Sequence, residues 1–158
     1  MSANRFVLFG ALALASALGA SGCGAAFDMQ PPPDFVELDE DTSYDLRATN
    51  AQGVVISVRE LDNDPEGSVT FWLDAIKNRM RTVRGYALVE EHDVRAQGGA
   101  TGKQLRFGRD EGTQPYVYWI TVFVTDNHIF VVEAGGKRDD FEHVRPQIER
   151  AIAAFDAG

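Results

Sequence analysis

Histidines close to carboxylates are the residues whose chemistry has to be tested first in this sequence. His92, His128 and His143 each have Asp or Glu residues nearby in the chain, and the densest group spans residues 139–143. On a helix, Asp139 and His143 share one face at a spacing that suits two metal ligands. A third ligand would have to come from elsewhere, so we expect an acidic first helical turn and no metal site.

Two loops resemble ion-binding motifs but lack residues that those motifs require. Residues 62–67 alternate oxygen ligands before a glycine, yet Leu73 stands where a calcium loop needs a bidentate glutamate. Residues 98–103 are glycine-rich, but Gln97 and Gln104 replace the first glycine and the Ser or Thr of a phosphate loop, and a strand follows. We therefore expect no cofactor.

Nucleophilic and acid–base catalysis has no recognisable motif here. The sequence contains no Gly-x-Ser-x-Gly pattern, and its single cysteine, Cys23, lies in a signal-like segment. Glu90 and Glu91 are adjacent, so on a strand they point to opposite faces and cannot share one reaction centre. We expect a protein that is not an enzyme. An unrecognised hydrolase would need one of the histidines close to a serine or carboxylate in space.

Aromatic residues are the remaining candidates for binding. Trp72, Tyr116, Tyr118 and Trp119 are the predicted partner or ligand surface, because large amphipathic rings favour interfaces and pockets. The competing interpretation is that these side chains belong to the hydrophobic core.

The first 22 residues have the order of a bacterial export signal. Arg5 precedes an apolar run at residues 6–18, which is shorter than the about 20 residues that span a bilayer as a helix. Residues 20–23, Ala-Ser-Gly-Cys, resemble the lipobox of bacterial lipoproteins. This resemblance implies that residues 1–22 are removed and that Cys23 carries acyl chains. The alternative is an ordinary cleaved signal with Cys23 as a free thiol.

The segment at residues 23–33 is predicted to be a tether, since Pro31, Pro32 and Pro33 favour an extended conformation. Two or three acyl chains on Cys23 would hold the domain at a membrane, on the extracytoplasmic side. By resemblance to lipoproteins of double-membraned bacteria, Gly24 favours the outer membrane, because an aspartate there retains proteins at the inner one.

A single domain at residues 34–158 follows, within the usual size range. The chain has a net charge of −9, which repels nucleic acid phosphates, so we expect no nucleic acid partner. Periodicity and turn residues predict strands, a helix that ends before Gly85, and a last helix interrupted at Pro146 by a kink or a restart. The expected strands are 35–38, 44–48, 54–58, 86–94, 103–109, 115–125 and 128–134, and the helices are 69–84 and 139–155.

Two of these elements carry further information. Both faces of residues 116–124 are largely apolar, which indicates a central strand covered on both sides. Basic residues crowd the later turns of the first helix, where positive charge complements the helix dipole without any ligand; they are Lys77, Arg79, Arg81 and Arg84. An antiparallel sheet of six to seven strands packed with two main helices is the expected α+β fold.

The order of elements and several short segments resemble the PsbP-like superfamily, which includes DcrB-type bacterial envelope lipoproteins. The segments are Gly85-Tyr86, residues 102–107, 116–118 and 130–134, and the last helix with Ile148, Ile152 and Phe155. The resemblance implies an α/β/α sandwich over residues 34 to about 156 and a non-catalytic accessory or partner-binding role. The family shares no catalytic motif, so no functional residue carries over.

The leading hypothesis is a membrane-anchored accessory lipoprotein that binds another envelope protein. The alternative is a small-ligand-binding lipoprotein, in which the sheet and a helix enclose an apolar pocket. A concave, partly exposed aromatic pocket would favour the ligand, and a flat apolar patch would favour the protein partner.

Overall fold

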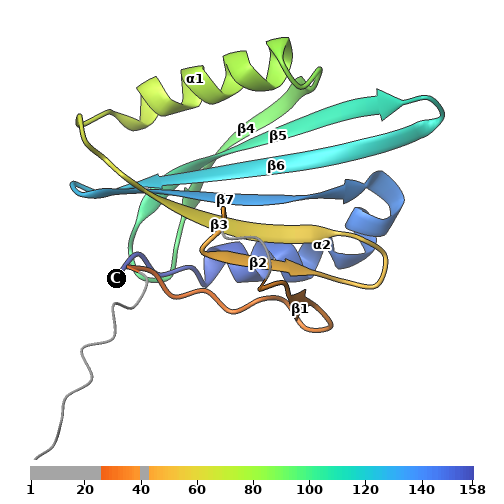
Figure 1. Ribbon diagram of the computed structural model, residues 1–158, viewed down its shortest axis with the longest axis horizontal. Coiled ribbons are helices and arrows are strands. Elements are labelled where there is room, and N and C mark those ends of the chain that lie inside the picture. Colours follow the sequence, from red (N-terminus) through yellow and green to blue (C-terminus); the bar gives the residue numbers. More distant parts are fainter. Residues whose placement is uncertain (1–25, 40–42) are drawn as a thin grey trace, which may run out of the picture.

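An antiparallel sheet lies between two helices in the computed structural model, which describes residues 26–39 and 43–158 (Figure 1). The elements in chain order are β1 (Val36–Glu37), β2 (Leu46–Thr49), β3 (Val55–Asp62), α1 (Val69–Thr82), β4 (Ala87–Arg95), β5 (Thr101–Glu111), β6 (Gln114–Val124), β7 (His128–Lys137) and α2 (Arg138–Ala153). The α+β class predicted from the sequence is confirmed.

The sheet has the strand order β1-β2-β3-β7-β6-β5-β4, and every neighbouring pair is antiparallel. Strands β4 to β7 follow one another as neighbours, and β3 joins the two halves of the sheet by pairing with β7. This order leaves β1 and β4 at the two edges.

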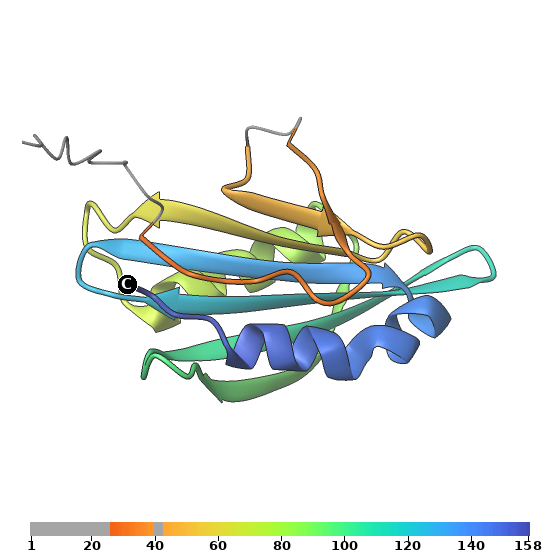
Figure 2. The same cartoon turned by 90° about the horizontal axis from the view of Figure 1, so that it is seen from below.

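The helices cover opposite faces of the sheet (Figures 1 and 2). Helix α2 packs on β6 and β7, and α1 packs on β4, β5 and β6. Side chains of β6 alternate between the two helices: Trp119 and Phe123 belong to the core under α2, whereas Ile120 and Val122 belong to the core under α1. The prediction that this strand is covered on both sides is confirmed.

Helix α1 begins at the predicted residue, Val69, and ends at Thr82, two residues before the predicted end. The Ser68 side chain caps the first turn by accepting a hydrogen bond from the Phe71 amide at 3.3 Å. Gly85 follows the last turn with φ of 67°, a left-handed conformation that glycine adopts without steric cost. The chain can therefore reverse within a few residues and enter β4.

Residues 138–153 form one helix, α2, that continues through Pro146, so of the two predicted alternatives the restart is wrong. No restart occurs at the proline. Phe141, Ile148 and Ile152 on either side of it are buried against the sheet, and their burial outweighs the backbone hydrogen bond that a proline removes.

The predicted tether differs as well, because its described part lies against the domain. The amide of Asp28 donates to the carbonyl of Asp156 at 2.8 Å, and the reverse bond measures 2.9 Å. Met29 is buried, and the ring of Phe27 stacks on Phe155 with centroids 5.8 Å apart. These apolar side chains bind residues 26–29 to the core, so within the described residues the packed part of the chain begins at residue 26 and not at residue 34.

The export signal and Cys23 lie outside the described residues. Neither helix within residues 26–39 and 43–158 has the length and apolarity needed to cross a membrane.

Candidate interaction surface

The two faces of the sheet are covered to different extents. Helix α2 buries four side chains, Phe141, Ile148, Ala151 and Ile152, whereas α1 buries only Leu73 and Met80. Beneath α2 the rings of Phe123, Phe130 and Phe155 pack at centroid distances of 4.8 to 5.4 Å. The face under α1, which we call the α1 face, is therefore the less completely closed side of the domain.

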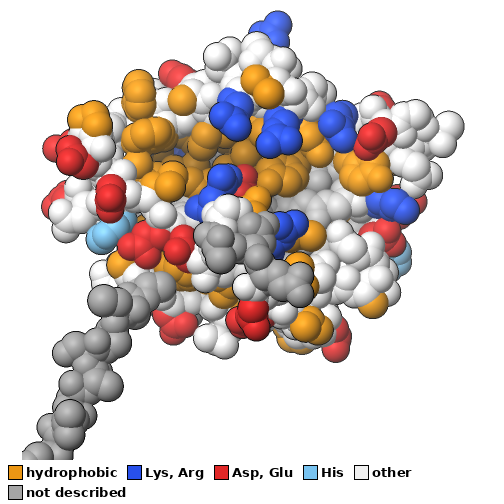
Figure 3. Space-filling model, viewed as in Figure 1, with side chains coloured by type: hydrophobic (Ala, Val, Ile, Leu, Met, Phe, Trp, Pro, Cys, Tyr) orange, Lys and Arg blue, Asp and Glu red, His pale blue; other side chains and the backbone are white. Residues whose placement is uncertain are grey.

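Hydrophobic side chains gather on the α1 face, and several Lys and Arg side chains lie around them (Figure 3). The partly buried members of this apolar group are Val69, Trp72, Ile76, Tyr86, Tyr118 and Val124. More exposed apolar side chains lie on α1 and its C-terminal end, since Phe71 is 59% exposed and Val83 is 69% exposed. Exposed apolar groups next to charged ones are typical of a surface that contacts another molecule.

A hollow of about 510 Å³ opens at the end of α1, where the chain turns into β4. Its apolar walls come from Tyr86, Ala87, Leu88 and Phe107, and Lys77 and Arg81 of α1 add two cations. We call this feature the α1–β4 hollow. Gly85 also lines it, so the tight turn after α1 helps to shape the hollow.

The cations around the hollow have different partners. The Lys77 ammonium lies 2.7 Å from a carboxylate oxygen of Glu91. The Arg109 guanidinium lies over the ring of Tyr86 at 4.9 Å, 3.0 Å from Glu111, and donates to the carbonyl of Arg84 at 3.3 Å. Within residues 26–39 and 43–158, Arg81 has no carboxylate at ion-pair distance. The hollow therefore has a surplus of positive charge.

A buried ion pair lies further along the α1 face. The Arg59 guanidinium donates to Glu133 at 2.8 Å, and Glu133 is only 7% exposed. Burial, and then the charge of Glu133 close by, raise the pKa of Tyr118 above its ordinary value of 10.0. Arg59 also lies over the ring of Tyr44 at 5.3 Å. This pairing compensates the buried carboxylate, so we assign it a structural role.

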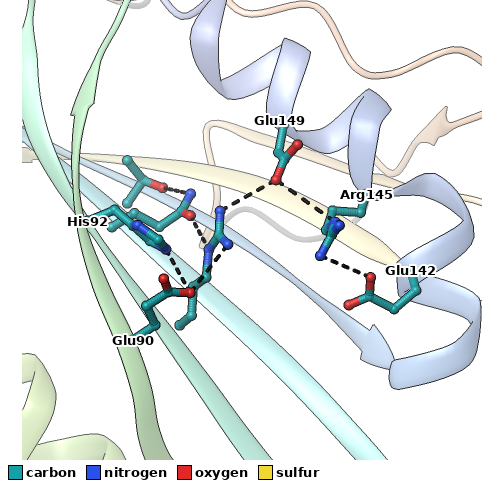
Figure 4. Close-up of polar contacts among 8 residues, drawn as sticks. Glu90, His92, Glu142, Arg145 and Glu149 are labelled. Carbon is teal, nitrogen blue, oxygen red and sulfur yellow. Dashed lines mark hydrogen bonds and ion pairs between the residues drawn. The ribbon is translucent and has the colours of Figure 1, made fainter.

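A polar network occupies the opposite face, between β4, β5, β6 and α2 (Figure 4). At its centre the Arg106 guanidinium covers the ring of Trp119 at 3.9 Å. Arg106 donates to the Gln104 side chain at 2.7 Å, and Gln104 donates to the Thr121 hydroxyl at 3.0 Å. Arg106 also lies 3.4 Å from Glu149 of α2.

The outer part of this network is more exposed (Figure 4). Glu90 lies 3.6 Å from Arg106 and 2.9 Å from His92, while Arg145 contacts Glu142 at 3.2 Å and Glu149 at 4.0 Å. These contacts join one edge of the sheet to α2. We assign these ion pairs the role of positioning α2, because each carboxylate lies beside an arginine.

The structure divides the four predicted aromatic residues between the two faces. Trp119 is 5% exposed and packs on Phe141 with ring centroids 4.9 Å apart, so it belongs to the core under α2. Trp72 and Tyr118 belong to the rim of the core under α1. Tyr116 lies two residues before Tyr118 on β6 and therefore shares the α1 face. Three of the four residues are thus on one surface and Trp119 is not.

The sequence interpretation missed the hollow itself. Arg81 belonged to the basic cluster that the helix dipole explained, and no local signal placed Tyr86, Leu88 and Phe107 together. Only the pairing of β4 with β5, which sets Leu88 opposite Phe107, brings these residues to one place.

The three histidines lie apart in the fold. His92 is on β4, next to Glu90; His128 is at the start of β7, 3.3 Å from Glu60; and His143 of α2 lies 2.7 Å from the Asp139 carbonyl. Strands β5 and β6 separate β4 from β7. In the described part of the chain, no three His, Cys, Asp or Glu side chains are grouped so that they could hold a metal ion.

Comparison with known proteins finds likeness in structure only. No family model and no curated protein sequence matches the chain. LpqN of Mycobacterium tuberculosis, which is involved in cell envelope biogenesis, is similar with a TM-score of 0.66 at 12% identity over 82% of each chain. A Pseudomonas aeruginosa protein of unknown function has a TM-score of 0.51 at 12% identity, covering 78% of this chain and 82% of that one.

The cyanobacterial PsbP of Synechocystis is also similar. Its TM-score is 0.51 at 13% identity, and the match covers 87% of this chain and 97% of that one. At such identities the likeness concerns the arrangement of helices and strands. The chain has the PsbP-like fold, as its sequence predicted.

Proposed function

We propose that this protein is a lipid-anchored accessory protein of the cell envelope, which binds another envelope protein through the α1 face and catalyses no reaction. The observation that carries the proposal is the incomplete closure of that face, with Val83 69% exposed and Leu88 44% exposed beside the apolar hollow. Exposed apolar side chains with charged neighbours are typical of interaction surfaces.

The likeness to LpqN supports the location, since that protein has the same fold and is involved in cell envelope biogenesis. The lipobox-like sequence before Cys23 supports the anchor. An outer-membrane location follows from Gly24 and remains part of the proposal.

The packed N-terminal segment makes the proposed anchor short. The amide of Ala26 donates to Glu60 at 3.1 Å, so the chain is already held by the domain at residue 26. Three residue steps separate it from Cys23, a reach of about 10 Å even when fully extended. A lipidated Cys23 would therefore keep the domain next to the membrane, where a partner in the same membrane meets it often.

Photo-crosslinking in cells tests whether the α1 face binds an envelope protein. A photo-reactive amino acid replaces Val83 in the full-length chain, and a matched exposed position on α2, Arg150, serves as control. We expect a specific envelope protein to be crosslinked from position 83 and not from position 150. Equal crosslinking from both positions, or none from position 83, would contradict the proposal.

Mass spectrometry tests the anchor separately. The mature N-terminal peptide should start at Cys23 and carry acyl chains, and Cys23→Ser should release the protein from the membrane fraction. An unmodified cysteine in the mature protein would sink this part of the proposal and leave partner binding open.

A small-ligand-binding lipoprotein is the second candidate, because about 510 Å³ is within the size range of ligand pockets and the walls are aromatic and aliphatic. Protein extracted from membranes and analysed by native mass spectrometry would then carry a small molecule. Leu88→Asp, which puts a charge at the wall, should remove that molecule.

A further inference from the structure

We infer that the α1–β4 hollow binds an extended segment of the partner protein that presents a bulky apolar side chain and, two residues away on the same face, a carboxylate. The inference rests on the proposed function and adds the chemistry of the bound segment. Its first basis is the lining: Tyr86, Leu88 and Phe107 supply apolar walls that favour a bulky apolar side chain.

The charged side chains around the hollow are the reason why the bound segment should carry a carboxylate. The positive charge of Lys77 is compensated by Glu91 at 2.7 Å and by Asp74 at 3.8 Å. The charge of Arg109 is compensated by Glu111 at 3.0 Å. Arg81 lines the hollow, and in the described ranges 26–39 and 43–158 no carboxylate pairs with it. A carboxylate beside Arg81 would form a charge-assisted hydrogen bond that the isolated domain does not make.

The neighbouring edge of the sheet favours a polypeptide over a small molecule. Strand β4 forms one edge of the sheet and pairs with β5 on its inner side. The backbone groups on its outer side are therefore available to pair with a further strand. Leu88 is 44% exposed and Val89 is 72% exposed on this strand, directly after the turn that shapes the hollow. An extended segment that pairs with such an edge gains backbone hydrogen bonds while alternate side chains enter a pocket.

The rest of β4 restricts the position of the segment. Further along β4, Glu91 already pairs with Lys77 at 2.7 Å and Asp93 with Lys103 at 2.8 Å, so these two cations are not available to an acidic group of the segment. The carboxylate of the segment must therefore lie at the Ala87 end, beside Arg81, and the apolar side chain must lie over Leu88 and Phe107.

Defined peptides test this chemistry on the full chain reconstituted in nanodiscs of neutral phosphatidylcholine. The probes are short fluorescent peptides with the repeat Leu-Ser-X-Ser, in which X is Glu, Gln or Lys, so that Leu and X lie on the same face of an extended chain. They are called the Leu–Glu, Leu–Gln and Leu–Lys peptides, and fluorescence anisotropy gives each Kd. We expect the Leu–Glu peptide to bind roughly tenfold more tightly than the Leu–Gln peptide, since the charge pair adds to the same apolar contact.

A charge exchange provides the decisive variant. Arg81→Glu should reverse the preference, so that the Leu–Lys peptide binds more tightly than the Leu–Glu peptide, and Leu88→Ser should weaken all three. Arg150→Glu makes the same charge change on α2, on the opposite face, and should leave every Kd unchanged. Circular dichroism confirms that each variant is folded.

Three outcomes would overturn the inference: no binding of any peptide, equal binding of all three, or an unchanged preference in Arg81→Glu. Displacement of the peptides by dodecyl phosphate together with an unchanged preference would assign the hollow to a small amphiphile. If photo-crosslinking from position 83 captures a partner and Arg81→Glu leaves that yield unchanged, the proposed function stands and this inference fails.

Discussion

Helices α1 and α2 have similar lengths, yet α2 buries four side chains against its face of the sheet and α1 buries two against the other. Under α2, phenylalanine rings and the Arg106 network hold the helix to β5, β6 and β7. Under α1, apolar side chains reach the rim and surround a hollow. The difference indicates that the α2 face contributes more to the stability of the domain, and it is the basis for proposing the α1 face as the interaction surface.

The largest expected effect on stability concerns the face of the sheet under α2. Phe141→Ala should lower the free energy of unfolding by about 3–5 kcal/mol, because it removes a fully buried ring that packs on Trp119. Urea denaturation measures the change, and Glu142→Ala on the exposed side of α2 is the control. A loss below about 1 kcal/mol would mean that α2 is not the main support of the sheet.

Truncating a buried side chain on the α1 face should lower the free energy of unfolding by a smaller amount. Leu73→Ala removes a buried side chain of α1, and we expect a loss of about 2–3 kcal/mol, because the partly open surroundings can relax into the space. A loss equal to that of Phe141→Ala in the same urea experiment would break the comparison between the faces.

The polar network should contribute a smaller amount. Arg106→Met keeps much of the apolar stem but loses the guanidinium over Trp119 and its bond to Gln104, so we expect a loss of about 1–2 kcal/mol. Arg145→Met is the matched variant, because Arg145 makes only exposed ion pairs and should cost less than about 0.5 kcal/mol. If both variants lose the same free energy of unfolding, the position of the Arg106 guanidinium over the Trp119 ring does not contribute to stability.

Alkaline pH should destabilise the α1 face through Tyr118. Its pKa in the folded state is raised above 10.0 by burial and by Glu133, so the folded state retains the proton that the unfolded state releases. The contribution of Tyr118 to the free energy of unfolding is therefore constant below about pH 10 and decreases as the pH rises above it. Thermal unfolding from pH 8 to 11 should show a smaller decline for Tyr118→Phe, whereas Tyr116→Phe should follow the unmodified protein.

The smallest effect on stability should accompany the largest effect on binding. Leu88→Ser changes an exposed side chain, so unfolding should shift by no more than about 0.5 kcal/mol. Crosslinking from position 83 should nevertheless fall several-fold. If stability falls and crosslinking does not, the α1–β4 hollow belongs to the core and the contrast between the faces is wrong.

Local sequence determined the elements of this protein. Alternating apolar residues predicted the strands, Gly85 marked the end of α1, and two apolar faces identified β6 as a strand covered on both sides. The overall PsbP-like arrangement was also expected from the order of these segments. Such features are predictable because they depend on neighbours within a few residues in the chain.

Tertiary structure decided what distant residues do together. Residues 26–29 became part of the core only because Phe155, at the other end of the chain, offers a ring to Phe27. Trp119 and Tyr118 are adjacent in sequence but lie on opposite faces, and the α1–β4 hollow exists only where α1 crosses the β4–β5 pair. Packing between segments far apart in the sequence leaves no periodic signal in either segment, so only the folded chain shows it.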